Sequence, residues 1–190
     1  MPDREMTGRE NNEIGLLFRA LAFAAEKHQH QRRKDIEAQP YINHPIAVAS
    51  ILANEGGIAN PEILAGAILH DTIEDTETSR AELAELFGDR IATIVTEVTD
   101  NKSLPKAERK RLQVAHGPTL SHEAKLVKLA DKISNLRDLA VSPPANWAAT
   151  RKADYCDWAE QVVAGVRGQN ARLDAVFDAT AARLRAMLAG

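Results

Sequence analysis

Helical periodicity runs through almost the whole chain, and it limits the possible folds more than any other feature of the sequence. Ala and Leu dominate segments whose apolar residues recur three and four positions apart, whereas the alternation typical of half-buried strands is almost absent. Proline, serine and glycine punctuate these segments at positions where helices begin and end. The sequence therefore predicts an all-α fold.

These signals also place the helices. Pro45 and Pro61 suit first helical positions, Ser79 and Ser121 suit N-caps, and Gly88 suits a helix end. We expect eight or nine helices in a bundle, over about residues 13–30, 45–55, 61–75, 80–88, 89–99, 105–115, 121–139, 147–166 and 169–188.

The N-terminus differs from the rest of the chain in composition. Residues 1–12 are polar and are expected to form a flexible extension, followed by one domain over residues 13–190. In the first helix, the side chains expected to face the core are Ile14, Leu17, Phe18, Leu21 and Ala25.

Composition excludes several classes of protein. The chain has 190 residues, of which 44% are hydrophobic, and a net charge of −3, so nothing global points to a nucleic acid or an anionic membrane as partner. Cys156 is the only cysteine, which excludes a disulfide framework and a thiolate zinc site and fits a reducing cytoplasm. No apolar run approaches the roughly 18 residues of a membrane span.

The helix predicted from Pro61 carries the first chemical signal. Its apolar stripe is Ile63, Leu64, Ala67 and Ile68, and the next positions on that stripe are His70, Asp71, Glu74 and Asp75. Carboxylates on a core-facing stripe repel one another, and they are also unfavourable at a helix C-terminus. A bound cation would resolve this conflict. The alternative is a helix end at which the carboxylates simply reach solvent.

A metal site needs ligands from other segments as well. Asp131 lies beside the apolar stripe of residues 125–139, and His44 lies just before a predicted helix start. His44, His70, Asp71 and Asp131 would provide two imidazoles and two carboxylates, a set that suits a hard or borderline divalent ion such as Mn²⁺. The remaining histidines, expected at the surface, are His28, His30, His116 and His122.

Five segments together resemble a known family. They are RRKDIEAQPYINHP, ILHDTIED, VTDNKSLPKAERKR, KLVKLADKISNLRDL and WAATRKADYCDWA, in that order within residues 14–180. This set is similar to the HD-domain hydrolases of the RelA/SpoT group, and most of all to the small, hydrolase-only metazoan SpoT homologues. The resemblance implies an HD-domain helical bundle with a central metal site. Because the sequence contains no synthetase region, we expect an enzyme that only degrades the alarmone.

The resemblance also implies a reaction and roles for residues. In that family one Mn²⁺ is held by the residues that match His44, His70, Asp71 and Asp131, and the reaction converts guanosine tetra- or pentaphosphate to GDP or GTP and pyrophosphate. Glu74 and Asp75 match the acid/base pair that acts on the attacking water. Matches to residues around the substrate are Arg33, Lys34, Lys106, Asn135, Arg151 and Tyr155.

Some of these matches have a structural alternative. Lys106 could belong to a solvated charged helix face, and Tyr155 could pack in the core with Trp147 and Trp158. The loop over residues 35–39 has no glycine, although relatives often have one there.

Two other functions fit the same residues. The site could remove the 2′-phosphate of NADPH or hydrolyse another nucleotide, or the domain could be an inactive HD module that senses a nucleotide. In each case the expected partner is a small nucleotide, and the sequence does not predict the oligomeric state.

Overall fold

The computed structural model describes residues 8–189. Its α-helical segments are α1 (Gly8–Lys27), α2 (Asn43–Ser50), α3 (Pro61–Leu69), α4 (Thr72–Asp75), α5 (Arg80–Phe87), α6 (Asp89–Val98), α7 (Lys106–His116), α8 (His122–Val141), α9 (Ala149–Val166) and α10 (Ala171–Ala189). A π-helical turn, η1 (Ile51–Glu55), extends α2, and a 3₁₀ turn, η2 (Gly117–Thr119), extends α7. Within the described residues β-structure is limited to two isolated bridges, so the predicted all-α class is confirmed.

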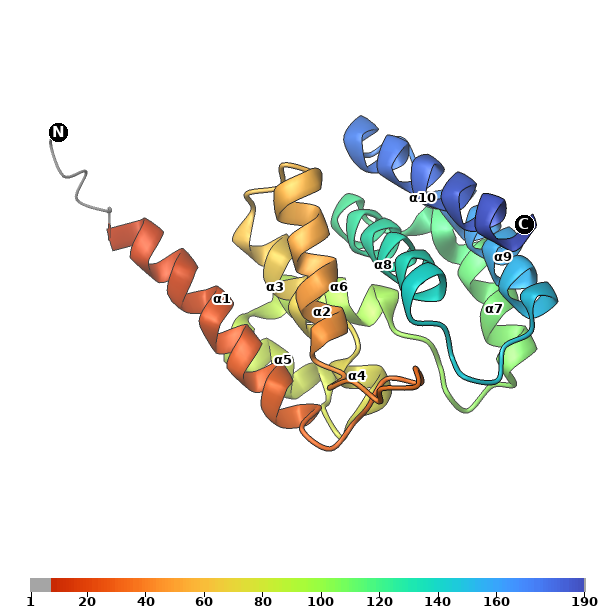
Figure 1. Ribbon diagram of the computed structural model, residues 1–190. Helices are drawn as coiled ribbons and strands as arrows, with labels where there is room; N and C mark the ends of the chain where they lie inside the picture. The colour runs from red at the N-terminus through yellow and green to blue at the C-terminus, as the bar shows by residue number, and fades with distance from the viewer. Residues whose placement is uncertain (1–7, 190) are drawn as a thin grey trace, which may run out of the picture.

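Helix α8 forms the centre of the bundle. It packs against α2, α3, α6, α9 and α10, and Leu126, Leu129 and Ile133 on α8 are fully buried. A second, smaller core joins α1, α3, α5 and α6. Figure 1 shows α8 in the middle of the molecule, with α1 at one end and α9 and α10 at the other.

Side-chain caps fix the starts of the helices that matter for the site. The carboxamide oxygen of Asn60 accepts hydrogen bonds from the backbone of Glu62 and Ile63, at 2.9 and 3.4 Å, at the start of α3. Ser121 caps α8 by accepting from the backbone N–H of Ala124 at 3.2 Å. Each cap pairs an N–H that a helix leaves without an internal partner.

The first helix begins earlier than the sequence suggested. It starts at Gly8, five residues before the predicted start, and ends at Lys27. Part of the predicted flexible extension is therefore helical, and residues 1–7 lie outside the described part of the chain.

The prediction of the inward face of α1 was wrong at three positions. Ile14 and Phe18 are 42% and 66% exposed, and Ala25 is exposed as well. The buried residues are Ala20 and Ala24, which pack in the core shared with α3. Alanine has the smallest side chain that keeps helix propensity, so it allows two helix backbones to approach closely.

The helix predicted over residues 61–75 is interrupted in the middle of its chemical motif. Helix α3 ends at Leu69, the single turn α4 begins at Thr72, and His70 and Asp71 form the junction. The hydroxyl of Thr72 donates to the carbonyl of Leu69 at 2.7 Å, which satisfies an acceptor that the interrupted helix leaves open. His70 and Asp71 therefore lie at a break between two helical segments and not within one continuous helix.

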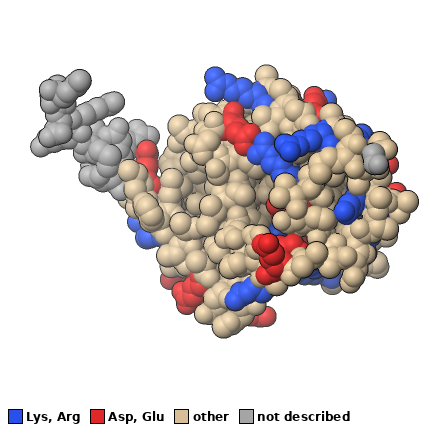
Figure 2. Space-filling view, in the orientation of Figure 1, with Lys and Arg blue, Asp and Glu red and all other residues tan. Residues whose placement is uncertain are grey.

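The surface shows no dominant charge on the face drawn in Figure 2. Lys and Arg groups lie among Asp and Glu groups, and most of that face is neither acidic nor basic. None of the helices within residues 8–189 is long and apolar enough to cross a membrane.

The loop between α1 and α2 contains one strained residue. The backbone N–H of Arg33 donates to the carbonyl of Gln39 at 2.9 Å, which closes the loop, and Ala38 has a φ of 49°. This left-handed conformation costs a residue with a Cβ about 1 kcal/mol, whereas glycine adopts it freely. Ala38 thus lies in the 35–39 loop, which contains no glycine.

Replacing Ala38 with glycine should stabilise the protein. Relief of the left-handed strain exceeds the entropy that glycine adds to the unfolded chain, so we expect a gain of about 0.5 kcal/mol and a Tm higher by roughly 1–2 °C. The control is Ala22→Gly on the exposed face of α1, which should lower stability by about 1 kcal/mol. Thermal unfolding measures whether the Tm rises in Ala38→Gly and falls in Ala22→Gly. A lower Tm for Ala38→Gly would contradict the proposed backbone strain at this residue.

Candidate metal centre and active-site cleft

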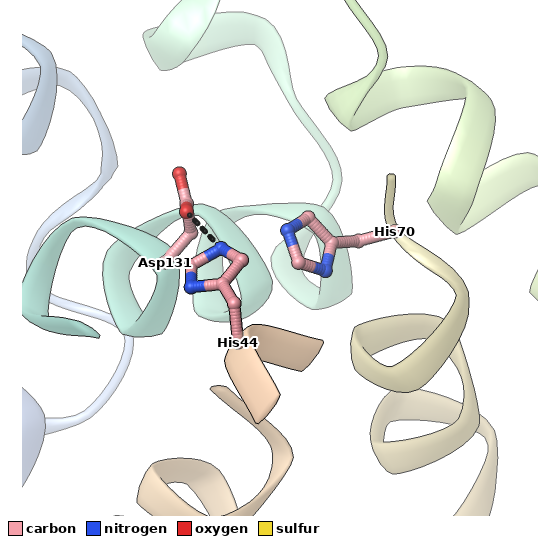
Figure 3. Close-up of side chains that lie close together, drawn as sticks. All are labelled: His44, His70 and Asp131. Atoms are coloured by element: carbon pink, nitrogen blue, oxygen red, sulfur yellow. Dashed lines mark ion pairs between the residues drawn. The ribbon is translucent and has the colours of Figure 1, made fainter. Parts of the chain in front are cut away.

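Three side chains from different helices meet near the centre of the molecule. His44 comes from the start of α2, His70 from the end of α3, and Asp131 from α8. One ligand atom from each lies within 4.8 Å of the others, and the three side chains point toward one another in Figure 3. The Nε2 atom of His44 lies 3.2 Å from a carboxylate oxygen of Asp131.

Contacts behind the two imidazoles set their orientation. The Nδ1 atom of His70 lies 2.8 Å from the backbone carbonyl of Ala67, and Nδ1 of His44 lies 3.2 Å from the hydroxyl of Ser134. Both Nε2 atoms therefore face the centre. Nε2 of His70 is buried, and the polar atom recorded beside it is a carboxylate oxygen of Asp71, at 3.0 Å. An imidazole held from behind, with its inner nitrogen next to a carboxylate, is the arrangement found in histidine metal ligands.

Asp71 completes the group from one side. One of its carboxylate oxygens lies 3.0 Å from Nε2 of His70 and 3.8 Å from Nε2 of His44, and it accepts a hydrogen bond of 2.6 Å from the hydroxyl of Tyr41. Asp71 does not belong to the group of His44, His70 and Asp131, whose ligand atoms all lie within 4.8 Å of one another. The structure thus brings together three of the predicted ligands closely and places the fourth beside them.

The group concentrates negative charge in a buried place. Burial opposes ionisation of Asp71, but the neighbouring His70 and His44 hold the pKa of its carboxyl below the usual value. Burial similarly opposes ionisation of Asp131, and Lys132 and His44 hold its pKa well below the usual range. Burial alone would lower the pKa of His70, but the adjacent Asp71 raises it to about 9. The site thus favours a positive charge at its centre, which a divalent cation supplies.

A cleft of about 930 Å³ opens beside this centre, and Glu74 and Asp75 line it. The carboxylate of Asp75 accepts a hydrogen bond of 2.9 Å from the side chain of Gln31 and forms an ion pair with Lys102. These contacts come from the turn after α1 and from the loop after α6. Asp75 is thus fixed from two sides.

Glu74 is held by the segment that leads into α7. One carboxylate oxygen accepts from the backbone N–H of Asp100 at 3.0 Å, and the other lies 3.5 Å from the guanidinium of Arg109. Burial and the nearby carboxylate of Asp100 raise the pKa of Glu74. A raised pKa brings the proton exchange of a carboxyl group closer to neutral pH, as acid/base catalysis requires.

The residues predicted to surround the substrate lie at or beside the same cleft. Arg33, Lys34, Asn135 and Tyr155 line it. Arg151 stacks on Trp147, another lining residue, with 4.4 Å between the guanidinium carbon and the ring centroid. Burial and the positive charges of Arg151, Lys34 and Arg109 lower the pKa of Lys106, so these bases form one cluster.

Two of these residues also have structural contacts. The carboxamide of Asn135 donates to Asp131 at 2.6 Å, which orients a candidate ligand. Tyr155 packs its ring 5.8 Å from Trp147 and 5.1 Å from Trp158, between centroids, and burial raises the pKa of its hydroxyl to about 12. Tyr155 is therefore both a cleft residue and a packing residue.

Comparison with known proteins identifies the family. A model described as the HD domain matches residues 20–156, a range that contains all four candidate ligands. The chain belongs to the HD-domain family. The HD pair for which such domains are named corresponds here to His70 and Asp71, at the junction between α3 and α4.

Close relatives within the HD-domain family cover most of the chain. The proteins named guanosine-3′,5′-bis(diphosphate) 3′-pyrophosphohydrolase MESH1 from Danio rerio and Homo sapiens are 57% and 53% identical to it, over 84% and 86% of this chain and 88% and 91% of their own lengths. A solved structure of a metazoan orthologue of SpoT, described as hydrolysing ppGpp and having a role in starvation responses, matches with a TM-score of 0.86 at 45% identity. It covers 88% of this chain and 94% of that one.

Several residues of the HD-domain site were missed by the sequence analysis. They are Gln31, Tyr41, Lys102 and Arg109, which contact the acidic residues of the site. Tyr41 lies three residues before His44, and Lys102 and Arg109 flank Lys106, so all three lie within motifs already recognised. Their contacts depend on how distant segments pack and are not encoded in the motifs.

The histidine predictions were correct for three residues and wrong for one. His30, His116 and His122 are exposed, as expected. His28 is only 2% exposed, and its Nδ1 lies 2.6 Å from the carboxamide oxygen of Gln31, the residue that donates to Asp75. It is buried because the turn after α1 folds back over the end of that helix, so that its ring stacks near Tyr41.

Metal binding should stabilise the folded protein. Protein stripped with a chelator and then given Mn²⁺ at about 100 times its Kd should gain about 2.7 kcal/mol, or roughly 5–10 °C in Tm. His70→Ala removes an inner nitrogen and should abolish most of this gain, whereas His30→Ala at the surface should keep it. Thermal shift and metal content measure the effect, and an unchanged gain in His70→Ala would contradict the assignment.

Proposed function

We propose that this protein hydrolyses guanosine 3′,5′-bis(diphosphate), or the corresponding pentaphosphate, to GDP or GTP and pyrophosphate. The observation that carries the proposal is the near full-length similarity to proteins named for this activity, at 57% and 53% identity. It is supported by the site, which combines a buried candidate metal group, two further carboxylates and a cluster of bases around one cleft. We place the enzyme in the cytoplasm, where its single cysteine stays reduced.

We assign one divalent ion, Mn²⁺, to the centre formed by His44, His70, Asp71 and Asp131. Two imidazole nitrogens and carboxylate oxygens fit this ion, and the hydrogen bond behind His70 turns its Nε2 toward Asp71 and the centre. A divalent cation held there supplies Lewis-acid chemistry, which makes water more acidic and neutralises phosphoryl charge.

Glu74 and Asp75 are assigned as the acid/base pair. In the reaction, water adds to the phosphorus attached to the ribose 3′ oxygen, and the bond between that phosphorus and the 3′ oxygen breaks. A proton leaves the water and another must reach the 3′ oxygen. The two carboxyl groups border the cleft one turn beyond Asp71, where they can accept and return these protons.

The bases around the cleft are assigned to the phosphates. The substrate carries two pyrophosphate groups, and a cluster that includes Lys34, Lys106 and Arg151 offers the cations that such a polyanion needs in addition to the metal. Arg33 lies on the same wall, where its guanidinium also faces the Tyr41 ring at 5.6 Å. Asn135 and Tyr155 line the same cleft, Asn135 next to Asp131, and both are assigned to substrate contacts.

The decisive assay measures Mn²⁺-dependent turnover of the alarmone with pyrophosphate as the detected product. We expect pyrophosphate and GDP in equal amounts from the tetraphosphate. NADPH serves as the competing substrate in parallel reactions, with free phosphate as its product. Turnover of NADPH alone would replace the proposal with the 2′-phosphatase, and absence of turnover on both would favour a nucleotide-sensing domain.

Substitution of the acid/base pair should separate metal binding from catalysis. Glu74→Gln and Asp75→Asn should keep the metal-dependent rise in Tm but lose activity by about 10²- to 10⁴-fold, because no positioned group then moves the proton. Glu77→Gln, on the exposed turn that follows, is the matched control and should keep full activity. If the two variants lose metal to the same extent as Asp71→Asn, these residues are ligands and not the acid/base pair.

A further inference from the structure

Helix α7 presents two different charged faces. Lys106, Arg109, Lys110 and Gln113 recur at the spacing of one helical face, and Glu108 and Arg111 lie on the other. On the outer face, Arg111 donates two hydrogen bonds to Glu108, at 2.8 and 2.6 Å. On the inner face, Arg109 reaches the acidic end of the cleft.

Arg109 and the loop before α7 hold both oxygens of Glu74. The guanidinium of Arg109 lies 3.5 Å from one oxygen, and the backbone N–H of Asp100 binds the other at 3.0 Å. Gln113, one turn after Arg109, donates to the carboxylate of Asp100 at 2.7 Å and so braces the loop. One short segment therefore determines where the Glu74 carboxylate lies.

Arg109 is partly enclosed between the cleft and a second cavity. Its side chain is 25% exposed, and it lines both the main cleft and a smaller cavity of about 180 Å³ that extends toward Lys128. Its Nε is buried and has no hydrogen-bond partner among the described residues. Its guanidinium therefore presents a positive charge to Glu74 from a partly buried position.

Arg109 also lies at the inner end of the basic cluster. Its charge acts on Lys106, as do the charges of Lys34 and Arg151, but among these bases the structure records an ion pair with the acid/base carboxylates only for Arg109. Its position beside Glu74 distinguishes it from a residue that only binds phosphate.

We propose that Arg109 is the positioning residue for Glu74: it fixes one carboxylate oxygen at the edge of the cleft, so that the carboxyl group is oriented toward the reacting bond. This inference rests on the proposed function, because it concerns the acid/base pair of that reaction. Arg109 acts through Glu74 and does not itself transfer a proton.

Kinetics of variants at Arg109 test this role. Arg109→Gln should lower kcat about 10- to 100-fold, the effect of a misplaced catalytic group, and change KM by less than about threefold. Arg109→Lys keeps a charge at this position and should recover part of kcat. Arg111→Gln is the matched control on the outer face of α7 and should keep wild-type kcat and KM. An unchanged kcat for Arg109→Gln would overturn the proposal, and so would a rise in KM alone, which would make Arg109 a phosphate-binding residue.

A double-mutant cycle on thermal unfolding tests the pair without any substrate. We compare Glu74→Gln, Arg109→Gln and the double variant with the wild type in the metal-loaded protein. Because each single change leaves a half-buried charge without its partner, the double variant should lose less Tm than the sum of the two single losses. Additive losses would overturn the coupling. This measurement is independent of pyrophosphate release by the wild type, so failure of the proposed reaction and failure of this inference are distinguishable.

Discussion

The buried meeting of two carboxylates with two imidazoles is the interaction on which the rest of the site depends. Asp71 lies beside both His44 and His70, and Asp131 lies beside His44, with both histidines buried and the carboxylates largely so. Burying two like charges is unfavourable unless cations compensate them. In the chain itself the compensation comes from the ammonium of Lys132, 2.9 Å from Asp131, and from the raised pKa of His70. A divalent ion held by these residues would supply the same compensation of the two carboxylates.

The need to bring both His70 and Asp71 to this centre accounts for the interruption between α3 and α4. On an unbroken helix, His70 and Asp71 would point about 100° apart, and only one of them could face the centre directly. The junction allows both side chains to approach His44. A backbone hydrogen bond of 2.9 Å from Asp75 to Asp71 then restarts the helical turn and directs the acid/base residues to the cleft. The interruption thus places two chemical groups one turn apart.

Short-range features of this protein could be predicted from the sequence, and features that depend on distant packing could not. The caps at Ser79 and Ser121 and the fold class follow from local patterns of residue type and spacing. The meeting of His44 with His70 and Asp131 is not local, and it was expected from their residue types together with the resemblance to the HD-domain hydrolases. The inward face of α1 was wrong because periodicity weighs Ile14 and Phe18 above alanine, whereas close helix packing favours alanine.

Arg109 shows the same limit at the candidate site. The segment KAERKR has charges on both faces of its helix, and its composition alone suits a solvated surface. Only the packing of α7 against α9, and the loop that returns Asp100 to Glu74, reveal which face lines the cleft. The choice between the two faces is therefore a property of the fold.

The cations of the cleft are arranged so that two of them pair with the carboxylates that we propose as the acid/base pair. Lys102 and Arg109 pair with Asp75 and Glu74, so negative charge in the acid/base pair is balanced before any phosphate enters. Arg33 pairs with Asp138, whose side chain is 43% exposed, and such a solvent-accessible pair contributes no more than about 1 kcal/mol. A pyrophosphate group carries more charge and more acceptor oxygens than a carboxylate. Arg33 can therefore leave Asp138 and bind a substrate phosphate with only a small loss of free energy. In the proposed reaction, Lys102 and Arg109 would therefore hold the acid/base carboxylates, and Arg33 and the other bases around the cleft would remain available for the phosphates.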